Sequence, residues 1–185
     1  MKFIENFGSY YFCLSALFLV SCATVPKHST KGIPPVDEVD LNKYAGKWYE
    51  IARLPNWFEK ELVNVTATYQ LLPNGKIRVI NEGYKISAAG KHNIAKGKAW
   101  LPDPKVPGAL RVSFFWPFSG SYKIIKLDKK DYSYSVVTSD TKNYLWILCR
   151  TPEMDSDLYN KLVSFAKEKG FEVGNLIKVS QDWEK

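Results

Sequence analysis

Histidine and cysteine are scarce in this chain of 185 residues, which holds two of the first and three of the second. His28 lies in a proline-containing segment and His92 at the edge of an expected strand, so no Ser-His-Asp set can be assembled. No spacing of His, Cys, Asp and Glu is typical of a metal site. We therefore expect no catalytic residues, no metal and no cofactor. Cys149 is the one plausible nucleophile for an enzyme, and its setting better matches a small apolar core residue.

Arginine is also rare, and the positive charge comes mostly from scattered lysines. The formal net charge is +7. Because the chain has neither an arginine-rich stripe nor the aromatic run of an RNA-binding sheet, nucleic acid is not expected as a partner. A basic balance of this kind is compatible with anionic lipid head groups.

Apolar runs long enough to cross a bilayer are missing as well. The longest run covers residues 12–20, follows Lys2, and has the length of a signal-peptide core. It ends at residues 19–22 in Leu-Val-Ser-Cys, which resembles the processing site of bacterial lipoproteins. The resemblance implies that residues 1–21 are a signal peptide and that Cys22 becomes acylated, enough for stable membrane anchoring. The alternative is a plain secretory signal or a transmembrane anchor with an incidental cysteine.

The residues around Cys22 also bear on location and redox chemistry. Ala23 follows Cys22 where some lipoproteins have aspartate, which suggests sorting to the outer membrane, with the folded domain facing the periplasm. Cys13 would leave with the signal peptide, so only Cys149 would stay free and no disulfide could form within the chain. Residues 22–38 contain several prolines and no periodic apolar pattern, which predicts a tether. Residues 39–185 are then the folded domain.

Eight β-strands are predicted in that domain. Their spans are 48–54, 63–71, 77–84, 92–101, 109–115, 122–128, 132–138 and 144–150. Residues 63–71 alternate apolar and polar side chains, and Asn74-Gly75 indicates a tight turn to the next strand. With no helix between strands, an antiparallel meander is favoured. Eight such strands can close into an all-β, up-and-down barrel that is wide enough for one small ligand.

One helix is expected after the strands. Asp155 or Ser156 can cap its start, and Gly170 ends it. Its apolar face should pack on the outside of the barrel and consists of Leu158, Leu162, Phe165 and Ala166. Residues 175–180 predict a short final strand.

Taken together, these features resemble the lipocalin family and its bacterial outer-membrane branch. Residues 46–50, Gly-Lys-Trp-Tyr-Glu, are similar to the first signature of that family. Residues 127–134 occupy the place of the second signature, with its usual Thr-Asp-Tyr altered, and Arg150 matches the third. The resemblance covers residues 36–181. It implies a closed barrel end built from Gly46, Trp48 and Arg150, with the guanidinium over the indole.

Alternation from an inward-facing Trp48 predicts which side chains line the barrel. The candidate ligand-binding residues are Ala52, Leu54, Val65, Ala67, Tyr69, Val79, Asn81, Ala95, Ala99, Val112, Phe114, Tyr122, Ile124, Val137, Tyr144 and Trp146. Lys126 is expected to point inward as well. This lining is apolar with a few polar groups, and small side chains on residues 92–101 leave room. It suits an amphiphile such as a fatty acid or a lysophospholipid.

The sequence therefore predicts a lipid-anchored protein, not an enzyme, that stores or transports such lipids for membrane maintenance. Two other classes stay open: a protein-binding or structural envelope lipoprotein with a filled barrel, and an isomerase-type enzyme on the same fold. A homodimer is compatible with the lipid-binding role and with the protein-binding role. Aromatic residues in two loops expected at the mouth could pack over the rim or rest among membrane head groups; they are Trp57, Phe58, Trp116 and Phe118.

Overall fold

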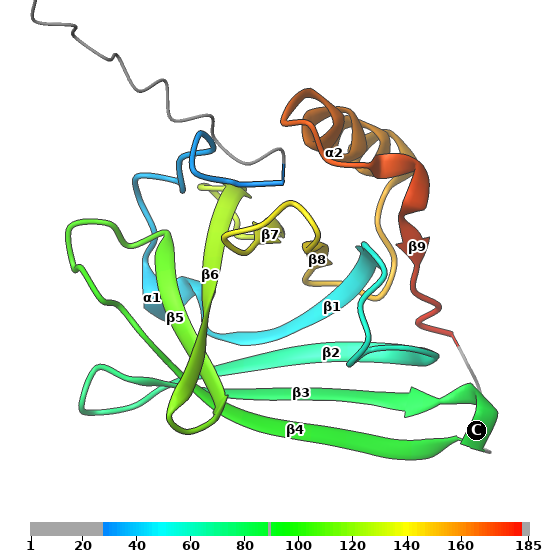
Figure 1. Ribbon diagram of the computed structural model, residues 1–185, viewed down its shortest axis with the longest axis horizontal. Helices are drawn as coiled ribbons and strands as arrows, with labels where there is room; N and C mark the ends of the chain where they lie inside the picture. The colour runs from blue at the N-terminus through cyan, green and yellow to red at the C-terminus, as the bar shows by residue number, and fades with distance from the viewer. Residues whose placement is uncertain (1–27, 89, 183–185) are drawn as a thin grey trace, which may run out of the picture.

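The computed structural model describes residues 28–88 and 90–182, and most of them form one closed antiparallel sheet (Figure 1). The strands are β1 (Gly46–Arg53), β2 (Leu62–Leu71), β3 (Ile77–Lys85), β4 (Lys91–Trp100), β5 (Ala109–Phe115), β6 (Phe118–Leu127), β7 (Tyr134–Thr138), β8 (Leu145–Cys149) and β9 (Ile177–Lys178). β1 pairs with both β2 and β8, which closes the first eight strands into a barrel. The predicted eight-stranded up-and-down barrel is confirmed.

The strands start and end close to their predicted positions, with the largest difference at β6. This strand begins at Phe118 instead of residue 122, because the β5–β6 ladder continues to the pair Phe115 and Phe118. The turn signal in residues 116–120 is thus confined to the two residues between the strands. Ladder hydrogen bonds extend the hairpin beyond the point at which local composition favours a loop.

The long helix packs outside the barrel as predicted. α2 (Ser156–Glu168) is capped by Asp155, whose side chain accepts a hydrogen bond from the Leu158 N–H. Leu162 and Ala166 are fully buried in an apolar cluster with outward-facing barrel residues such as Ile147. β9 pairs with β1 next to this helix, outside the closed barrel (Figure 1). The shorter helices are α1 (Leu41–Tyr44), η1 (Ile86–Ala88) and η2 (Val173–Asn175). In the parts of the chain that the structure describes, no helix has both the length and the apolarity to cross a bilayer.

A β-bulge in β1 reverses the inward and outward faces of its second half. The register with β8 shifts between Glu50 and Ala52. One extra residue in a strand sends every later side chain to the other face. Ala52 and Leu54 therefore pack in the outer cluster under α2, and their predicted place in the barrel lining is wrong. Arg53 takes the inward position and is buried.

A second bulge, in β6, has the same effect. The register with β7 shifts between Ile124 and Lys126. Ile124 stays in the interior core, whereas the Lys126 ammonium lies 4.6 Å from the ring centroid of Phe165 on α2. The predicted inward orientation of Lys126 is therefore wrong, because the bulge places both Ile125 and Lys126 on the outer surface.

Part of the predicted tether is packed on the barrel. We call residues 28–36 the N-terminal strap. Thr30 is fully buried, and its hydroxyl donates to the Ser139 carbonyl at 2.6 Å. Ile33 joins the outer apolar cluster, and the Val36 N–H donates to the Ile124 carbonyl. These long-range contacts, which local composition does not reveal, correct the expectation of a free tether for this stretch. Residues 1–27, including the proposed signal peptide and Cys22, lie outside the described residues.

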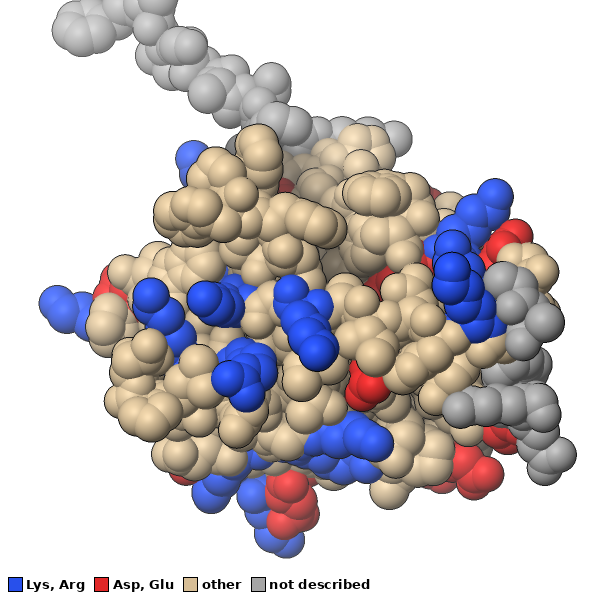
Figure 2. Space-filling model, turned by 90° about the horizontal axis from the view of Figure 1, so that it is seen from below, with Lys and Arg blue, Asp and Glu red and all other residues tan. Residues whose placement is uncertain are grey.

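The outer face of the barrel carries scattered positive charge. Arg78 on β3 lies directly opposite Lys98 on β4, and Lys96 is their exposed neighbour. Figure 2 shows lysine and arginine side chains spread over one side of the molecule, separated by uncharged surface. This basic charge thus lies on the outer face of the barrel, in contrast to the buried Arg53.

Candidate ligand-binding cavity

The barrel encloses a cavity of about 530 Å³. The predicted residues that line it are Val65, Ala67, Tyr69, Val79, Asn81, Ala95, Ala99, Val112, Phe114, Tyr122, Val137, Tyr144 and Trp146. Ala52 and Leu54 lie outside because of the β1 bulge, and Ile124 is packed in the core with Trp48 without lining the cavity. The cavity reaches the surface between the β1–β2 connection and the β5–β6 turn, because Trp57 and Phe118 line it while remaining mostly exposed.

Small side chains on three neighbouring strands make the room. Ala67, Asn81 and Ala95 lie side by side across β2, β3 and β4. Gly97, in contrast, leaves no free space, since a Cβ there would come within 2.8 Å of the Phe114 ring. Asn81 Oδ1 is buried and has no hydrogen-bond partner among the described residues. The cavity wall therefore holds an acceptor that a ligand donor or a water could satisfy.

A cluster of hydroxyl groups forms one polar end of the cavity. The Tyr122 hydroxyl lies 2.7 Å from that of Tyr44 and 2.9 Å from that of Tyr69, and Tyr44 is 3.3 Å from Ser135 Oγ. Three contacts among four hydroxyls use three protons, so one donor is left for a further partner. Burial raises the pKa of Tyr44 to about 12 and raises the pKa of Tyr69 and Tyr122 as well. All three phenols are neutral hydrogen-bond donors at neutral pH.

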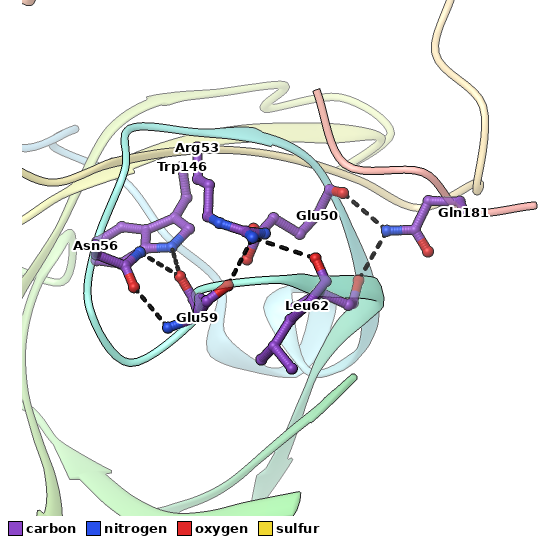
Figure 3. A network of polar contacts seen from close by, with 8 residues as sticks. Glu50, Arg53, Asn56, Glu59, Leu62, Trp146 and Gln181 are labelled. Carbon is purple, nitrogen blue, oxygen red and sulfur yellow. Dashed lines mark hydrogen bonds and ion pairs between the residues drawn. The ribbon is translucent and has the colours of Figure 1, made fainter. Parts of the chain in front are cut away.

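A buried network of charged groups forms the other polar end, near the mouth (Figure 3). The Arg53 guanidinium donates to Glu50 Oε1 at 2.7 Å and to the main-chain carbonyls of Glu59 and Leu62 at 2.7 and 3.1 Å. Trp146 Nε1 donates to Glu59 Oε2 at 3.0 Å. Both glutamates line the cavity. The network thus fixes the β1–β2 connection against β8 and places two carboxyl groups on the cavity wall.

The two carboxyl groups differ in their surroundings. Burial, with the added repulsion of Glu59, raises the pKa of Glu50 to about 8, although Arg53 opposes the shift. Glu59 is held by Trp146 and by the side-chain amide of Asn56. At neutral pH Glu50 is mainly protonated. The Arg53 guanidinium therefore donates to a carboxyl group that is mostly neutral.

Aromatic rings cover the wall next to Glu59. The ring centroids of Phe58 and Tyr144 are 6.0 Å apart, and those of Tyr144 and Trp146 are 5.9 Å apart. Trp57 meets Phe58 edge to face at 5.6 Å. This arrangement gives the outer half of the cavity a rigid apolar surface.

Sequence reasoning missed Tyr44, Glu50 and Glu59 as cavity residues. Tyr44 comes from α1, ahead of the first strand, so strand alternation does not reach it. Glu50 lies two residues after Trp48 in β1 and shares its inward face, so strand alternation was the signal that could have identified it as a cavity residue. Glu59 lies in a loop, where no periodic pattern indicates which way a side chain points.

The three residues expected at the closed end meet there. The Arg150 guanidinium carbon lies 3.9 Å from the Trp48 ring centroid. Gly46 has φ +98°, and a Cβ at this position would approach Arg150 Nη1 to 3.2 Å. Only glycine tolerates both the backbone conformation and the close approach. Cys149 is buried near this end and contacts the Thr151 hydroxyl, away from the cavity.

Comparison with known proteins gives consistent matches over almost all of the folded part. Residues 39–181 match a family model described as a lipocalin-like domain. The "Outer membrane lipoprotein Blc" of Vibrio cholerae serotype O1 is 41% identical over 172 residues, covering 91% of this chain and 99% of that protein. The protein of the same name from Escherichia coli K12 is 39% identical over 167 residues, covering 90% and 93%. "Temperature-induced lipocalin-1" of Arabidopsis thaliana is 36% identical over 160 residues, covering 82% and 84%.

Solved structures share the fold at lower identity. Insecticyanin from the tobacco hornworm Manduca sexta superposes with a TM-score of 0.66 at 20% identity, over 83% of this chain and 85% of that one. The cockroach allergen Per a 4 has a TM-score of 0.62 at 22% identity, over 80% and 91%. At such identities the likeness shows a common barrel and nothing of the ligand.

Proposed function

The chain belongs to the lipocalin family, and from that premise we propose that it is an outer-membrane lipoprotein that holds a lipid in its barrel. The names of the bacterial relatives, which describe outer membrane lipoproteins, support the location. The ligand class follows from the cavity. We propose fatty acids or lysophospholipids, stored or transported for membrane maintenance, with the barrel facing the periplasm.

The observation that carries the proposal is an apolar cavity of about 530 Å³ with a polar group at each end. This volume lies within the roughly 300–1,000 Å³ typical of small-molecule sites. The alanine row across β2 and β4 leaves space for an acyl chain. The tyrosine hydroxyls and the Arg53 network provide partners for the polar part of an amphiphile.

Binding is better supported than the two alternatives. A structural lipoprotein with a filled barrel does not need an open cavity lined by alanines. The one nucleophile that the sequence offered to an enzyme, the Cys149 thiol, is buried and does not line the cavity. The relatives' names likewise describe lipoproteins and lipocalins.

Filling the cavity tests the binding proposal. Ala95→Phe places a ring in the cavity, and Ile94→Phe places the same ring on the outer face of the same strand. Delipidated protein is titrated with lysophosphatidylethanolamine and with palmitate by calorimetry. We expect saturable binding by the wild type and by Ile94→Phe, and affinity at least ~10-fold weaker for Ala95→Phe. Unsaturable binding by the wild type, or equal affinity of both variants, would contradict lipid storage.

The proposed anchor has a separate test. The mass of the protein extracted from membranes should correspond to residues 22–185 plus diacylglycerol and an N-acyl chain on Cys22. Cys22→Ser should abolish this added mass, whereas Cys13→Ser, within the proposed signal peptide, should leave it unchanged. An unmodified Cys22 in membrane-extracted protein would refute the anchor without bearing on ligand binding.

A further inference from the structure

Large aromatic side chains project into solvent around the cavity mouth. We call them the rim aromatics: Trp57, Phe58, Phe115, Trp116 and Phe118, which are 82%, 42%, 79%, 85% and 77% exposed. They come from the β1–β2 connection and the β5–β6 turn. Clustered exposed apolar groups are uncommon on soluble monomers and mark binding surfaces. Among the described residues, the other large apolar side chains with high exposure are single isoleucines, such as Ile94 and Ile177.

Both aromatic segments lie at the same end of the barrel. In an up-and-down barrel the β1–β2, β3–β4, β5–β6 and β7–β8 connections share one end. Phe58 and Phe118 also line the same cavity. The rim aromatics therefore form one surface around the opening.

The N-terminal strap brings the start of the described chain to this same end. From α1 at the closed end, residues 36 to 28 run along the outside of β6 and β7 (blue in Figure 1). Ser29 forms a bridge with Thr141, and the Lys142 N–H donates to the His28 carbonyl at 2.6 Å. Thr141 and Lys142 belong to the β7–β8 connection, whose Tyr144 stacks on Phe58. His28 is thus held beside the mouth.

The distance from this point to the proposed anchor is short. Residues 22 and 28 are six positions apart, and six extended residues span at most ~20 Å. If the strap were a free tether, the anchor would not determine which end of the barrel faces the membrane. Because the strap is docked, acylation of Cys22 keeps the mouth, and not the closed end, next to the lipid.

We propose that the rim aromatics dock into the head-group layer of the leaflet that holds Cys22, so that the cavity opens onto the membrane. This inference rests on the acylated Cys22 of the proposed function. Tryptophan suits such a layer because its ring is apolar and its N–H is polar. Exposed Lys31 on the strap and Lys60 beside the rim are placed to meet lipid phosphates. An acyl chain could then move between leaflet and cavity without crossing bulk water.

The test compares the two ends of the barrel in the anchored full-length protein. A bimane probe is attached to Trp116→Cys at the rim or to Asn74→Cys in the β2–β3 turn, while Cys149 stays buried. The protein is reconstituted in vesicles of phosphatidylethanolamine and phosphatidylglycerol that carry a head-group-proximal spin-labelled lipid. We expect quenching several-fold stronger at position 116 than at position 74. Adding Trp57→Ser should weaken the quenching at 116, and the matched change Ile177→Ser should not.

The outcomes separate docking from lipid storage. Equal quenching at both positions, or quenching at 116 that Trp57→Ser leaves unchanged, overturns docking. Docking is also overturned if a second copy of the protein covers the probe at position 116 when no vesicles are present. Trp116 does not line the cavity, so lysophospholipid titration of the same labelled protein tests storage independently. If the protein binds ligand but the rim probe is not quenched, docking alone is refuted. If the rim probe is quenched but no ligand binds, lipid storage alone is refuted. If the protein is not acylated, docking is refuted together with the anchor.

Discussion

Arg150 and Trp48 share a hydrogen-bond acceptor while stacked on one another. The guanidinium carbon lies 3.9 Å from the indole centroid, and both side chains donate to the Tyr44 carbonyl, Arg150 Nη2 at 3.1 Å and Trp48 Nε1 at 2.9 Å. Arg150 also donates to the carbonyls of Lys43 and Lys47. The pair therefore joins α1, β1 and the end of β8, and it closes the barrel opposite the mouth.

Removing either member of this pair should reduce stability and leave ligand choice unchanged. We expect Trp48→Ala to lower the free energy of unfolding by about 3–5 kcal/mol, since a fully buried indole leaves a cavity. Arg150→Met should cost about 1–3 kcal/mol, because the partly buried carbonyls of Tyr44 and Tyr132 lose a donor. Urea unfolding measures both, with the exposed Arg78→Met as control. Normal stability with altered lipid preference would contradict a structural role.

Glu50 should make stability decrease with pH. Its pKa is about 8 in the folded protein, above the ordinary carboxyl value of 4.5. Below pH 4.5 the group is protonated in both folded and unfolded chains. Between 4.5 and 8 only the unfolded chain releases the proton, so the wild type loses stability as pH rises, and the loss is complete above 8.

The isosteric change Glu50→Gln removes this titration and keeps an oxygen to accept from Arg53. The unfolding free energy of the variant relative to the wild type should therefore rise across pH 4.5–8 and level off above it. Denaturant unfolding at several pH values, with the exposed Glu153→Gln as control, measures the difference. A difference independent of pH would show that Glu50 is ionised when buried.

The Tyr122 hydroxyl should serve both stability and ligand affinity. It contacts the hydroxyls of Tyr44 and Tyr69, so Tyr122→Phe breaks two hydrogen bonds in the cavity. We expect a loss of about 1–3 kcal/mol in the free energy of unfolding, and weaker binding of lysophospholipid. Tyr49→Phe, on the other face of β1, is the control. Unchanged ligand affinity in Tyr122→Phe would mean that the hydroxyl cluster does not touch the ligand.

The N-terminal strap should be a stabilising part of the domain. Ile33→Ala removes an apolar side chain from the outer cluster, with an expected cost of about 2–4 kcal/mol. The exposed Lys31→Ala should change little. Limited proteolysis of the strap is a second measurement, because cleavage should be faster in Ile33→Ala than in Lys31→Ala. Equal cleavage of both variants would indicate that the strap does not depend on Ile33.

Much of the barrel follows from local pattern alone. Alternation on residues 63–71, the Asn74-Gly75 turn and the cap and stop signals of α2 act over a few residues, and each is visible in the sequence. The inward faces of β3, β4, β7 and β8 were predicted because β3 pairs with β4, and β7 with β8, without a register shift. In β2 and β5 the predicted inward residues line the cavity although the register shifts between Val63 and Thr66 and between Val112 and Phe115. The family signature around Trp48 and Arg150 predicted their meeting across 102 positions (150 − 48), which pattern alone does not reach.

Only the tertiary structure decided the features that depend on distant partners. The bulges at Glu50–Ala52 and Ile124–Lys126 come from pairing with neighbouring strands, and a single extra residue leaves no periodic trace in the sequence. Arg53 can be buried because the main-chain carbonyls of Glu59 and Leu62 accept hydrogen bonds from its guanidinium. The strap is docked because the carbonyls of Ser139 and Ile124 accept hydrogen bonds from it. Local composition determined strands, turns and helix. Long-range hydrogen bonds determined which side chains enter the cavity and which end of the barrel the N-terminus approaches.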